Sequence, residues 1–545
     1  MINRTITYRQ PILALVSGCL TLVYFCHGHA EDSSAAILSN VRTVATSDQP
    51  INVRSSIPIG GSFLYTVLNN NGNVAFITYT AQRRFLWAER NGQLVSRISP
   101  EPEGDEIFFT DAEELFLTGN SGVPEGRFLK ERIWKWSASG LTQLAGPSLP
   151  AADESGSALS NFVYFDAALS SVHSSGSLIF EGTAHTPGVE FPEIAGFWIG
   201  NGQSNGNRLL FLFGDQVPGA AEGITFGHLD APPKINAQGN FIIGVRLSGP
   251  ANLERRALVT NSSGALEVMY RQGDQVPGKP DGVVFLNFGS PAINDKSDSV
   301  FTAATGTGSF MASGELFRER NGQLESIASS GQSVLDTQAN WTLAGMEDPV
   351  INAEGLVAFR GALNDPTQSD AIHGIFIEDS GKGIRAIVTD GSSVPGGPPE
   401  AQFFVQDWNT NFQLNRLGQV VVGTQFRTED DPTIKLGLFV DDPILGFIPI
   451  ALPGDLIQVK PGDIRQIAVA GISNRPTGNQ DGTQMTLNER GQILFLARFT
   501  DGTSGLFVSN AVAVPESRTA FLAVAAILAM LIPNSRWSAS WKCGG

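Results

Sequence analysis

The sequence predicts an all-β fold, a closed β-propeller of four-stranded antiparallel blades, and three observations carry this prediction. A short turn motif recurs along most of the 545-residue chain. Each copy is followed by strand-like apolar segments and by a second turn signal, as expected for a sheet built from consecutive hairpins. The two ends of the repeat array are also complementary, which favours a ring.

The turn motif has asparagine in its first position and glycine in its fourth. Its clearest copy is INAEGLVAF at residues 351–359. This pattern is typical of a type I turn, and the apolar residues on both sides predict strands buried on both faces. The structural turn residues that we assign are Asn69, Gly72, Asn236, Gly239, Asn352, Gly355, Asn415, Gly418, Asn488 and Gly491.

The remainder of each unit supplies two more strands. A third strand-like segment follows the motif, such as GFWI at 196–199, and a second hairpin comes next. ERNGQL occurs at both 89–94 and 319–324, and Asn-Gly is a strong hairpin signal. A fourth strand leads into a Gly-Asp-x-Val-Pro-Gly connection, at 214–219 and 273–278, where proline and glycine end the sheet.

The number of units depends on one degenerate copy. Asparagine, or its replacement His173, occupies the first motif position at 69, 173, 236, 294, 352, 415 and 488. EIFFTDAEELFLTG at 106–119 is a degenerate copy, with IWKW as its third strand. We therefore expect eight blades, or seven if this stretch is an insertion.

The ends of the array indicate how the ring closes. The last unit ends with GLFV at 505–508 and lacks a fourth strand, whereas VRTVATSDQP at 41–50 resembles a fourth strand without a unit. We expect Val41 to Thr46 to pair antiparallel with GLFV, because closure removes two exposed sheet edges. An open solenoid is the alternative architecture.

The amino-terminal segment, residues 1–30, reads as a secretory signal peptide. Arg4 and Arg9 precede an apolar run from Ile12 to Phe25, and Gly-His-Ala at 28–30 is a small-x-small cleavage signal. VSGC at 16–19 also fits a lipoprotein box, although the apolar run continues beyond it. The repeat domain itself is predicted at 41–509.

The carboxy-terminal segment, residues 512–545, contains a short motif, an apolar stretch at 520–532 and a basic end. This order resembles the PEP-CTERM sorting tail, with Val514, Pro515 and Glu516 as the motif and Ser517 departing from it. The resemblance implies an exosortase as processing partner in a Gram-negative bacterium. The apolar stretch is shorter than a typical membrane span, so a weak membrane anchor is the alternative.

The repeat resembles the bacterial family defined by the tandem motif NxxGxxAF. INAEGLVAF matches that motif in full, while His173 and Ser297 depart from it. The resemblance covers most of the chain after the signal segment. It implies an exported or cell-surface repeat protein without an assigned activity.

Composition excludes several classes of function. All three cysteines, Cys19, Cys26 and Cys543, lie in the terminal segments, so a disulfide framework and cysteine metal sites are excluded from the body. The whole chain carries a net charge of −17. An acidic body repels nucleic acid and anionic lipid, so we expect no nucleic-acid partner and membrane contact only through the carboxy-terminal tail.

Catalytic and metal-binding patterns are sparse, and no catalytic residue and no cofactor are predicted. The body histidines, His173, His185, His228 and His373, lack metal-ligand spacing. GQSNG at 202–206 matches a nucleophile motif but lies in a predicted hairpin loop. Asp215, Asp274 and Asp455 recur in the blade connections, where they are expected to bind loop backbone. NDKSDS at 294–299 and TEDDP at 428–432 leave calcium binding open.

Two functions follow from these observations. The first is an exported, non-catalytic scaffold or binding protein that contacts a glycan or a matrix protein. The second is a polysaccharide hydrolase or lyase with its site in the central channel. The enzyme requires carboxylates and an arginine or histidine from different blades to meet at one channel mouth.

Overall fold

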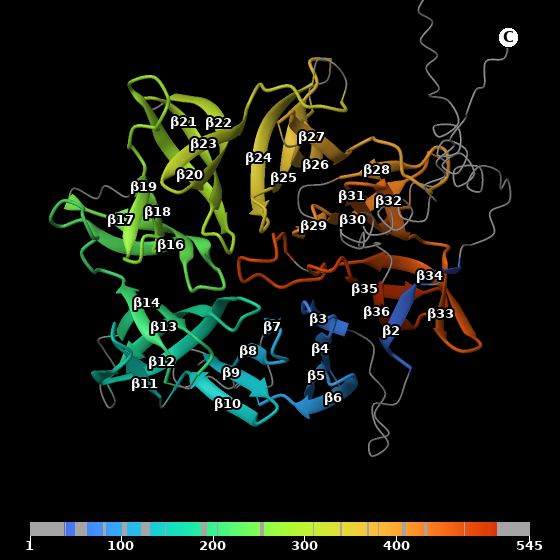
Figure 1. Ribbon diagram of the computed structural model, residues 1–545, viewed down its shortest axis with the longest axis horizontal. Helices are drawn as coiled ribbons and strands as arrows, with labels where there is room; N and C mark the ends of the chain where they lie inside the picture. Colours follow the sequence, from blue (N-terminus) through green and yellow to red (C-terminus); the bar gives the residue numbers. More distant parts are fainter. Residues whose placement is uncertain are drawn as a thin grey trace, which may run out of the picture.

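The computed structural model contains 36 strands and no α-helix among the residues that it describes. Eight sheets are arranged around a common centre (Figure 1). The described residues are 37–38, 40–48, 63–79, 83–100, 106–120, 131–147, 149–186, 193–203, 205–250, 255–308, 310–337, 341–367, 370–379, 381–405, 410–429, 433–472 and 475–509.

Each sheet is one blade, and blades 1 to 4 follow the chain in order. Blade 1 comprises β3 (Phe63–Leu68), β4 (Val74–Tyr79), β5 (Arg84–Arg90) and β6 (Gln93–Ile98). Blade 2 comprises β7 (Ile107–Phe109), β8 (Leu115–Asn120), β9 (Glu131–Ser137) and β10 (Gly140–Ala145). Blade 3 comprises β11 (Pro150–Ala152), β12 (Ala158–Val172), β13 (Leu178–His185), β14 (Glu193–Gly200) and β15 (Arg208–Leu212). Blade 4 comprises β16 (Thr225–Ile235), β17 (Phe241–Ser248), β18 (Arg255–Thr260) and β19 (Glu267–Arg271).

Blades 5 to 8 continue around the ring. Blade 5 comprises β20 (Val283–Ile293), β21 (Ser299–Thr307), β22 (Phe310–Arg320) and β23 (Gln323–Ser329). Blade 6 comprises β24 (Thr342–Ile351), β25 (Val357–Asn364), β26 (Ile372–Asp379) and β27 (Gly383–Thr389). Blade 7 comprises β28 (Gln402–Phe404), β29 (Asn411–Leu414), β30 (Val420–Arg427), β31 (Lys435–Asp442) and β32 (Gly446–Ala451). Blade 8 comprises β1 (Ile37–Leu38), β33 (Leu456–Lys460), β34 (Asp463–Gly471), β35 (Ile493–Phe499), β36 (Ser504–Ser509) and β2 (Val41–Thr46).

The degenerate copy near residue 110 forms a complete blade, so the count is eight. EIFFTDAEELFLTG supplies β7 and β8, and IWKW lies in β9. Thr110 takes the asparagine position of the turn, and Glu113 adopts φ 59° at the glycine position. The fold depends on the backbone path of the turn, and this copy keeps that path with other residues.

Closure of the ring occurs as predicted, which excludes the open solenoid. β2 pairs antiparallel with β36, with Arg42 opposite Val508 and Ala45 opposite Leu506. The outermost strand of the last blade therefore comes from the start of the chain. Arg42 also bonds Glu89 at 3.1 Å and the carbonyl of Gly72 at 2.8 Å, which joins blade 8 to blade 1.

The motif turns combine a type I turn with a left-handed fourth residue. In INAEGLVAF, Gly355 N–H donates to the Asn352 carbonyl, and Asn352 N–H donates to the carbonyl of Leu356. Gly355 has φ +83°, a conformation in which glycine avoids the strain of a side chain. The Asn352 side-chain oxygen accepts the N–H groups of Glu354 and Leu356, so this one residue organises the whole turn.

The motif asparagines also link neighbouring blades. The Asn236 amide nitrogen donates to the carbonyl of Asn294, 3.0 Å away in the next blade. The same contact repeats between successive motifs, which gives the series 236 to 294, 294 to 352, 352 to 415, 415 to 488, 488 to 69 and 69 to Thr110. Because these side chains are buried, the paired amide hydrogens explain why asparagine is needed there.

The hydrophobic core lies between adjacent blades and reaches around the ring. Val300 and Leu316 of blade 5 share one buried cluster with Ile351 and Phe359 of blade 6. Strands covered on both faces require consecutive apolar residues, as in LVAF. The end of the ring that carries the motif turns is called the turn face below.

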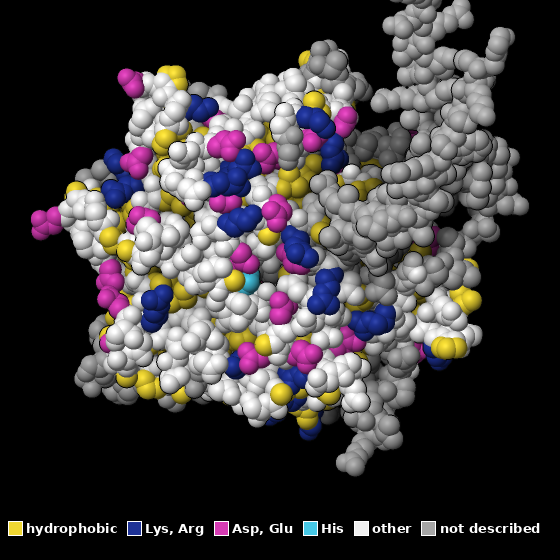
Figure 2. Space-filling view, in the orientation of Figure 1, with side chains coloured by type: hydrophobic (Ala, Val, Ile, Leu, Met, Phe, Trp, Pro, Cys, Tyr) yellow, Lys and Arg dark blue, Asp and Glu magenta, His cyan; other side chains and the backbone are white. Residues whose placement is uncertain are grey.

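Both terminal segments lie outside the described residues, including the predicted signal peptide and the sorting motif at 514–516. The described part of the chain holds no helix with the length and hydropathy of a membrane span. Figure 2 shows acidic and basic side chains interspersed over one face of the ring.

Candidate functional site

The axis of the ring contains part of the connection between β34 and β35. Residues 475–487 of this connection, which we call the axial segment, lie at the centre of the ring (Figure 1, orange-red). No other blade inserts so many described residues between its first and second long strands. This segment is polar in sequence yet largely buried, with Thr477, Asp481 and Leu487 at 0%, 1% and 0% exposure.

Backbone hydrogen bonds attach the axial segment to the innermost strands. Leu68 N–H donates to the Met485 carbonyl at 2.8 Å, and Val172 N–H donates to the Gly482 carbonyl at 2.9 Å. The same contact repeats for Ile235 with Asp481 and for Leu414 with Thr477. Each of these strand residues immediately precedes the first motif position, so the axial segment lies at the turn face.

Further contacts extend to the remaining blades. The Gln484 side chain donates to the Ile107 carbonyl of blade 2 at 3.0 Å. The Gln480 side chain accepts the Asp295 N–H of blade 5, also at 3.0 Å. Gly478 lies against the backbone of Ile351 in blade 6, where an added Cβ would collide. The segment thus contacts all seven other blades.

A buried ion pair fixes the middle of the axial segment. Lys234 Nζ lies 3.1 Å from Asp481 Oδ2 and also donates to the hydroxyl of Thr483. Asp481 Oδ1 accepts the Thr477 hydroxyl and the Thr483 N–H. A buried carboxylate is stable only with such partners, so this network holds the segment in one conformation.

A cavity of about 330 Å³ adjoins the axial segment. Its polar lining mixes hydroxyl, amide and charged groups, and its apolar lining is mainly proline. The lining residues are Glu106, Phe108, Ser170, Pro232, Pro233, Lys234, Ser290, Pro291, Asp348, Pro349, Arg360, Asn411, Arg475, Pro476, Thr483 and Gln484. Because they come from blades 2 to 8, seven of the eight blades form this central cavity.

Bulges in three successive inner strands shape the cavity wall. The β16, β20 and β24 registers shift near Pro233, Pro291 and Pro349, where proline cannot donate to the sheet. Asp348 adopts φ 46° at the third bulge, an uncommon conformation for a residue other than glycine. Bulges change the direction in which side chains point, and all three of these bulges lie at the cavity wall.

The charged groups of the cavity occur in pairs of opposite charge. Arg360 Nη1 lies 3.0 Å from Asp348 Oδ2, and Arg360 Nη2 donates to the Thr410 carbonyl. Arg475 Nη2 lies 3.5 Å from Glu106 Oε1. Lys234 and Asp481 form the third pair. Three cations are therefore paired with three carboxylates, and the cavity has no large excess of either charge.

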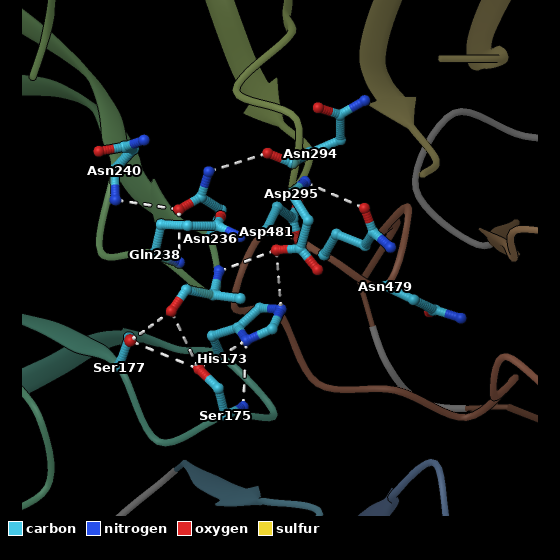
Figure 3. Close-up of polar contacts among 12 residues, drawn as sticks. His173, Ser175, Ser177, Asn236, Gln238, Asn240, Asn294, Asp295, Asn479 and Asp481 are labelled. Atoms are coloured by element: carbon cyan, nitrogen blue, oxygen red, sulfur yellow. Dashed lines mark hydrogen bonds and ion pairs between the residues drawn. The ribbon is translucent and has the colours of Figure 1, made fainter. Parts of the chain in front are cut away.

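A second polar cluster surrounds His173 at the turn face (Figure 3). His173 Nδ1 accepts the Ser175 N–H, the contact that the motif asparagine makes elsewhere. His173 Nε2 lies 3.4 Å from Asp295 Oδ1, which also accepts the Ala237 N–H. Burial lowers the pKa of His173 although the charge of Asp295 acts in the opposite direction. His173 therefore takes the place of the motif asparagine in this turn.

In blade 8, Glu489 follows the motif asparagine Asn488, as Asp295 follows Asn294 in blade 5. Its Oε2 accepts the Arg416 N–H of blade 7 at 2.7 Å, and its own N–H donates to Asn70 Oδ1 of blade 1. Burial raises the pKa of Glu489 to about 7, with Asp295 and Asp111 adding to the increase and Arg416 opposing it. Glu489 therefore joins three blades, through its carboxylate to blade 7 and through its backbone N–H to blade 1.

The other residues singled out in the sequence make local contacts. Asp215, Asp274 and Asp455 accept the N–H groups of Leu212, Arg271 and Leu452. GQSNG lies in the β14–β15 hairpin, and Ser204 is outside the described residues.

Of the two stretches considered for calcium binding, the structure describes NDKSDS at 294–299 completely and TEDDP at 428–432 only in part. In the first stretch, Asp298 forms an ion pair with Arg320. In the second, residues 430–432 lie outside the described residues. Within the described ranges, no group of three or more acidic, histidine or cysteine residues has the arrangement of a metal site.

The central channel was expected as the location of a hydrolase or lyase site, but the residues of the cavity wall were not predicted, although one signal was present. Proline stands three residues before the motif asparagine in INAQG, INDKS and INAEG, as Pro233, Pro291 and Pro349. The axial segment has no counterpart in the other units, so the repeat pattern held no information about it.

Comparisons with known proteins identify a family, and they find solved structures of low similarity. No curated protein matches the sequence. The Dos1 propeller is similar at 11% identity and a TM-score of 0.36, over 83% of this chain and 93% of that one. An ulvan lyase of polysaccharide lyase family PL25 is similar at 11% identity and a TM-score of 0.31, over 69% of this chain and 93% of that one.

An acylaminoacyl peptidase of Pyrococcus horikoshii is similar at 11% identity and a TM-score of 0.34, over 71% of this chain and 52% of that one. At these levels of similarity, no activity is transferred from these proteins. A family profile, in contrast, matches residues 68–521, which include nearly all the blades. The chain therefore belongs to the family of unknown function DUF7453.

Proposed function

We propose that the protein is an exported, non-catalytic binding module whose central cavity takes a glycan. The observation that carries this proposal is the composition of the cavity wall. Paired charges, hydroxyls and amides from seven blades supply both donors and acceptors around one small space. Sugar hydroxyls also donate and accept, so they complement such a wall without needing a charge.

The concave, proline-lined geometry favours a glycan over a protein ligand. Protein interfaces typically bury about 800 Å² on each partner, over a broad surface. The central cavity instead encloses about 330 Å³. Pro232, which is exposed, and Pro476, which is partly exposed, offer apolar surface for the C–H faces of a sugar ring, beside polar groups that fix its orientation.

The state of the carboxylates favours binding over turnover. Glycoside hydrolysis uses two carboxyl groups in different roles, one of them a proton donor. Asp348 and Glu106 lie 3.0 and 3.5 Å from arginine nitrogens, and no histidine is present among the described lining residues. Carboxylates and arginines from different blades do meet here, so a hydrolase or lyase is the second candidate.

The proposal places the protein at the cell envelope or outside the cell. The basic and apolar order of residues 1–30 supports export, and the tail at 512–545 supports processing by an exosortase. Mass spectrometry of protein from native cells tests this part. We expect no peptide containing Trp541 and Lys542, whereas recovery of that peptide would support a retained anchor.

A glycan array combined with a polysaccharide-digestion assay tests the binding proposal. We expect binding without new reducing ends or unsaturated products. Asp348→Asn and Glu106→Gln should each weaken binding about tenfold, which corresponds to about 1.4 kcal/mol. Glu354→Gln, at an exposed turn, is the matched control and should bind as wild type. Turnover that disappears with Asp348→Asn would establish the enzyme instead.

A further inference from the structure

We infer that the central cavity takes the end of a glycan chain and excludes its interior. This inference rests on the glycan binding proposed above and adds which part of the polymer is recognised. Its basis is that the axial segment closes one end of the cavity.

The axial segment closes the axis at the turn face. It is bonded through Met485, Gly482, Asp481 and Thr477 to inner strands of four different blades. Its central carboxylate, Asp481, is 1% exposed. A polymer cannot leave along the axis in this direction without displacing the segment.

The close contacts of two glycines leave little space beside the axial segment. A Cβ added to Gly478 would collide with the Ile351 carbonyl oxygen, and one added to Gly482 would collide with the Ser171 hydroxyl. The space therefore excludes even a methyl group at these points. A sugar ring is much larger, so it cannot pass.

The wall residues lie just before the axial contacts on the same strands. Ser170 precedes Val172 on β12, and Pro233 precedes Ile235 on β16. The cavity is therefore a cup whose floor is the axial segment. Its mouth lies on the side away from the turn face, where Ser290 and Pro232 are exposed.

The cup geometry selects a chain end. Ligand cavities range from about 300 to 1,000 Å³, so a volume of about 330 Å³ is small. A terminal unit can enter while its single neighbour points out of the mouth. An internal unit has two neighbours, and both would have to leave through the same mouth by a sharp reversal of the polymer.

A chain-end titration tests this inference with the intact protein. The probe is a linear polysaccharide that binds in the array, such as xylan or alginate, before and after limited hydrolysis to short chains. We expect the binding capacity per mass of polymer to rise in proportion to the number of chain ends. Equal capacity per mass before and after hydrolysis would overturn the inference and leave glycan binding intact. Failure of every glycan to bind would instead refute the proposed function.

A blocking variant locates the binding in the cup. Ser290→Trp adds a large ring to the wall at an exposed position and should abolish capture of the short chains. Ser263→Trp, an exposed position on the β18–β19 hairpin, is the matched control and should bind as wild type. Unchanged binding by Ser290→Trp would place the site elsewhere. The titration uses the wild-type chain, so it remains decisive if the variant does not fold.

Discussion

The guanidinium of Arg465 lies 2.7 Å from the carboxylate of Asp48, a residue 417 positions earlier in the chain. Asp48 follows β2, and Arg465 lies in β34, so this ion pair reinforces the closure of blade 8. The arginine lowers the pKa of Asp48 to about 2. The pair is partly exposed, and its contribution to stability is therefore modest compared with that of the strand itself.

Removal of residues 37–48 should lower the unfolding temperature of the whole ring and cause aggregation. The deletion exposes one edge of β36, including the buried Leu506 and Val508, as unpaired backbone beside apolar side chains. Calorimetry and light scattering measure the two effects.

Arg465→Ala is the control for this deletion. It should cost no more than about 1 kcal/mol, because it removes partly exposed ion pairs and leaves β2 in place. A truncated protein that stays monomeric and melts like wild type would contradict the role assigned to β2.

Asn352→Ala should destabilise the protein by about 3 kcal/mol. The change removes two hydrogen bonds inside the turn and one to Asn415, at a position that is 1% exposed. Each bond contributes about 1 kcal/mol, and the buried groups left without partners add to the loss. Chemical unfolding measures it. Glu354→Ala in the same turn is the control and should change stability by less than about 0.5 kcal/mol.

Glu489→Gln should alter how stability depends on pH. Burial raises the pKa of Glu489 from 4.5 to about 7, so its stabilising contribution is present below about pH 4.5 and is lost as pH rises through 7. Glutamine keeps an acceptor for the Arg416 N–H without the charge. The variant should gain stability relative to wild type at about pH 8, by at most about 3 kcal/mol, and lose this advantage near pH 5.

Paired unfolding curves of wild type and Glu489→Gln at the two pH values measure this gain. Because the comparison is a difference between two proteins, other titrating groups largely cancel. An identical pH profile for both proteins would show that Glu489 does not titrate in this range.

Lys234→Ala should destabilise the axial segment strongly. It leaves Asp481 buried without its cation, a change that costs about 3–5 kcal/mol for buried ion pairs. Lys234→Met combined with Asp481→Asn removes both charges and should recover part of the loss. Hydrogen exchange of residues 475–487 distinguishes local opening from global unfolding. Equal stability of the single and double variants would argue against charge burial as the cause.

The fold was predictable because its signals are local. Asparagine and glycine in the motif specify a turn, Asn-Gly specifies a hairpin, and both lie within a few residues of sequence. ERNGQL forms such hairpins twice, with Asn91 at φ 49° and Asn321 at φ 52°. The closing strand was predictable from complementarity of the two ends.

The site depends on contacts between residues far apart in the sequence. Lys234 and Asp481 belong to different blades, and neither side chain has an unusual local context. Arg360 meets Asp348 only because β24 bulges before Pro349. The axial segment occurs once, so no repeat marks it. Periodicity identifies what the blades share, so it gives no information about a segment that only one blade carries.

The link from the Asn488 amide to the Asn69 carbonyl spans 419 residues and gives the ring an order of assembly. The ribosome synthesises the acceptor, Asn69, long before the donor, Asn488. In the same way, β2 is made early and can pair only after β36 has been made. The first blade therefore emerges with its neighbour on one side missing until residue 509 has been synthesised. The ring cannot close before residue 509 is made, so the nascent chain lacks a completed ring while its eight blades are being synthesised.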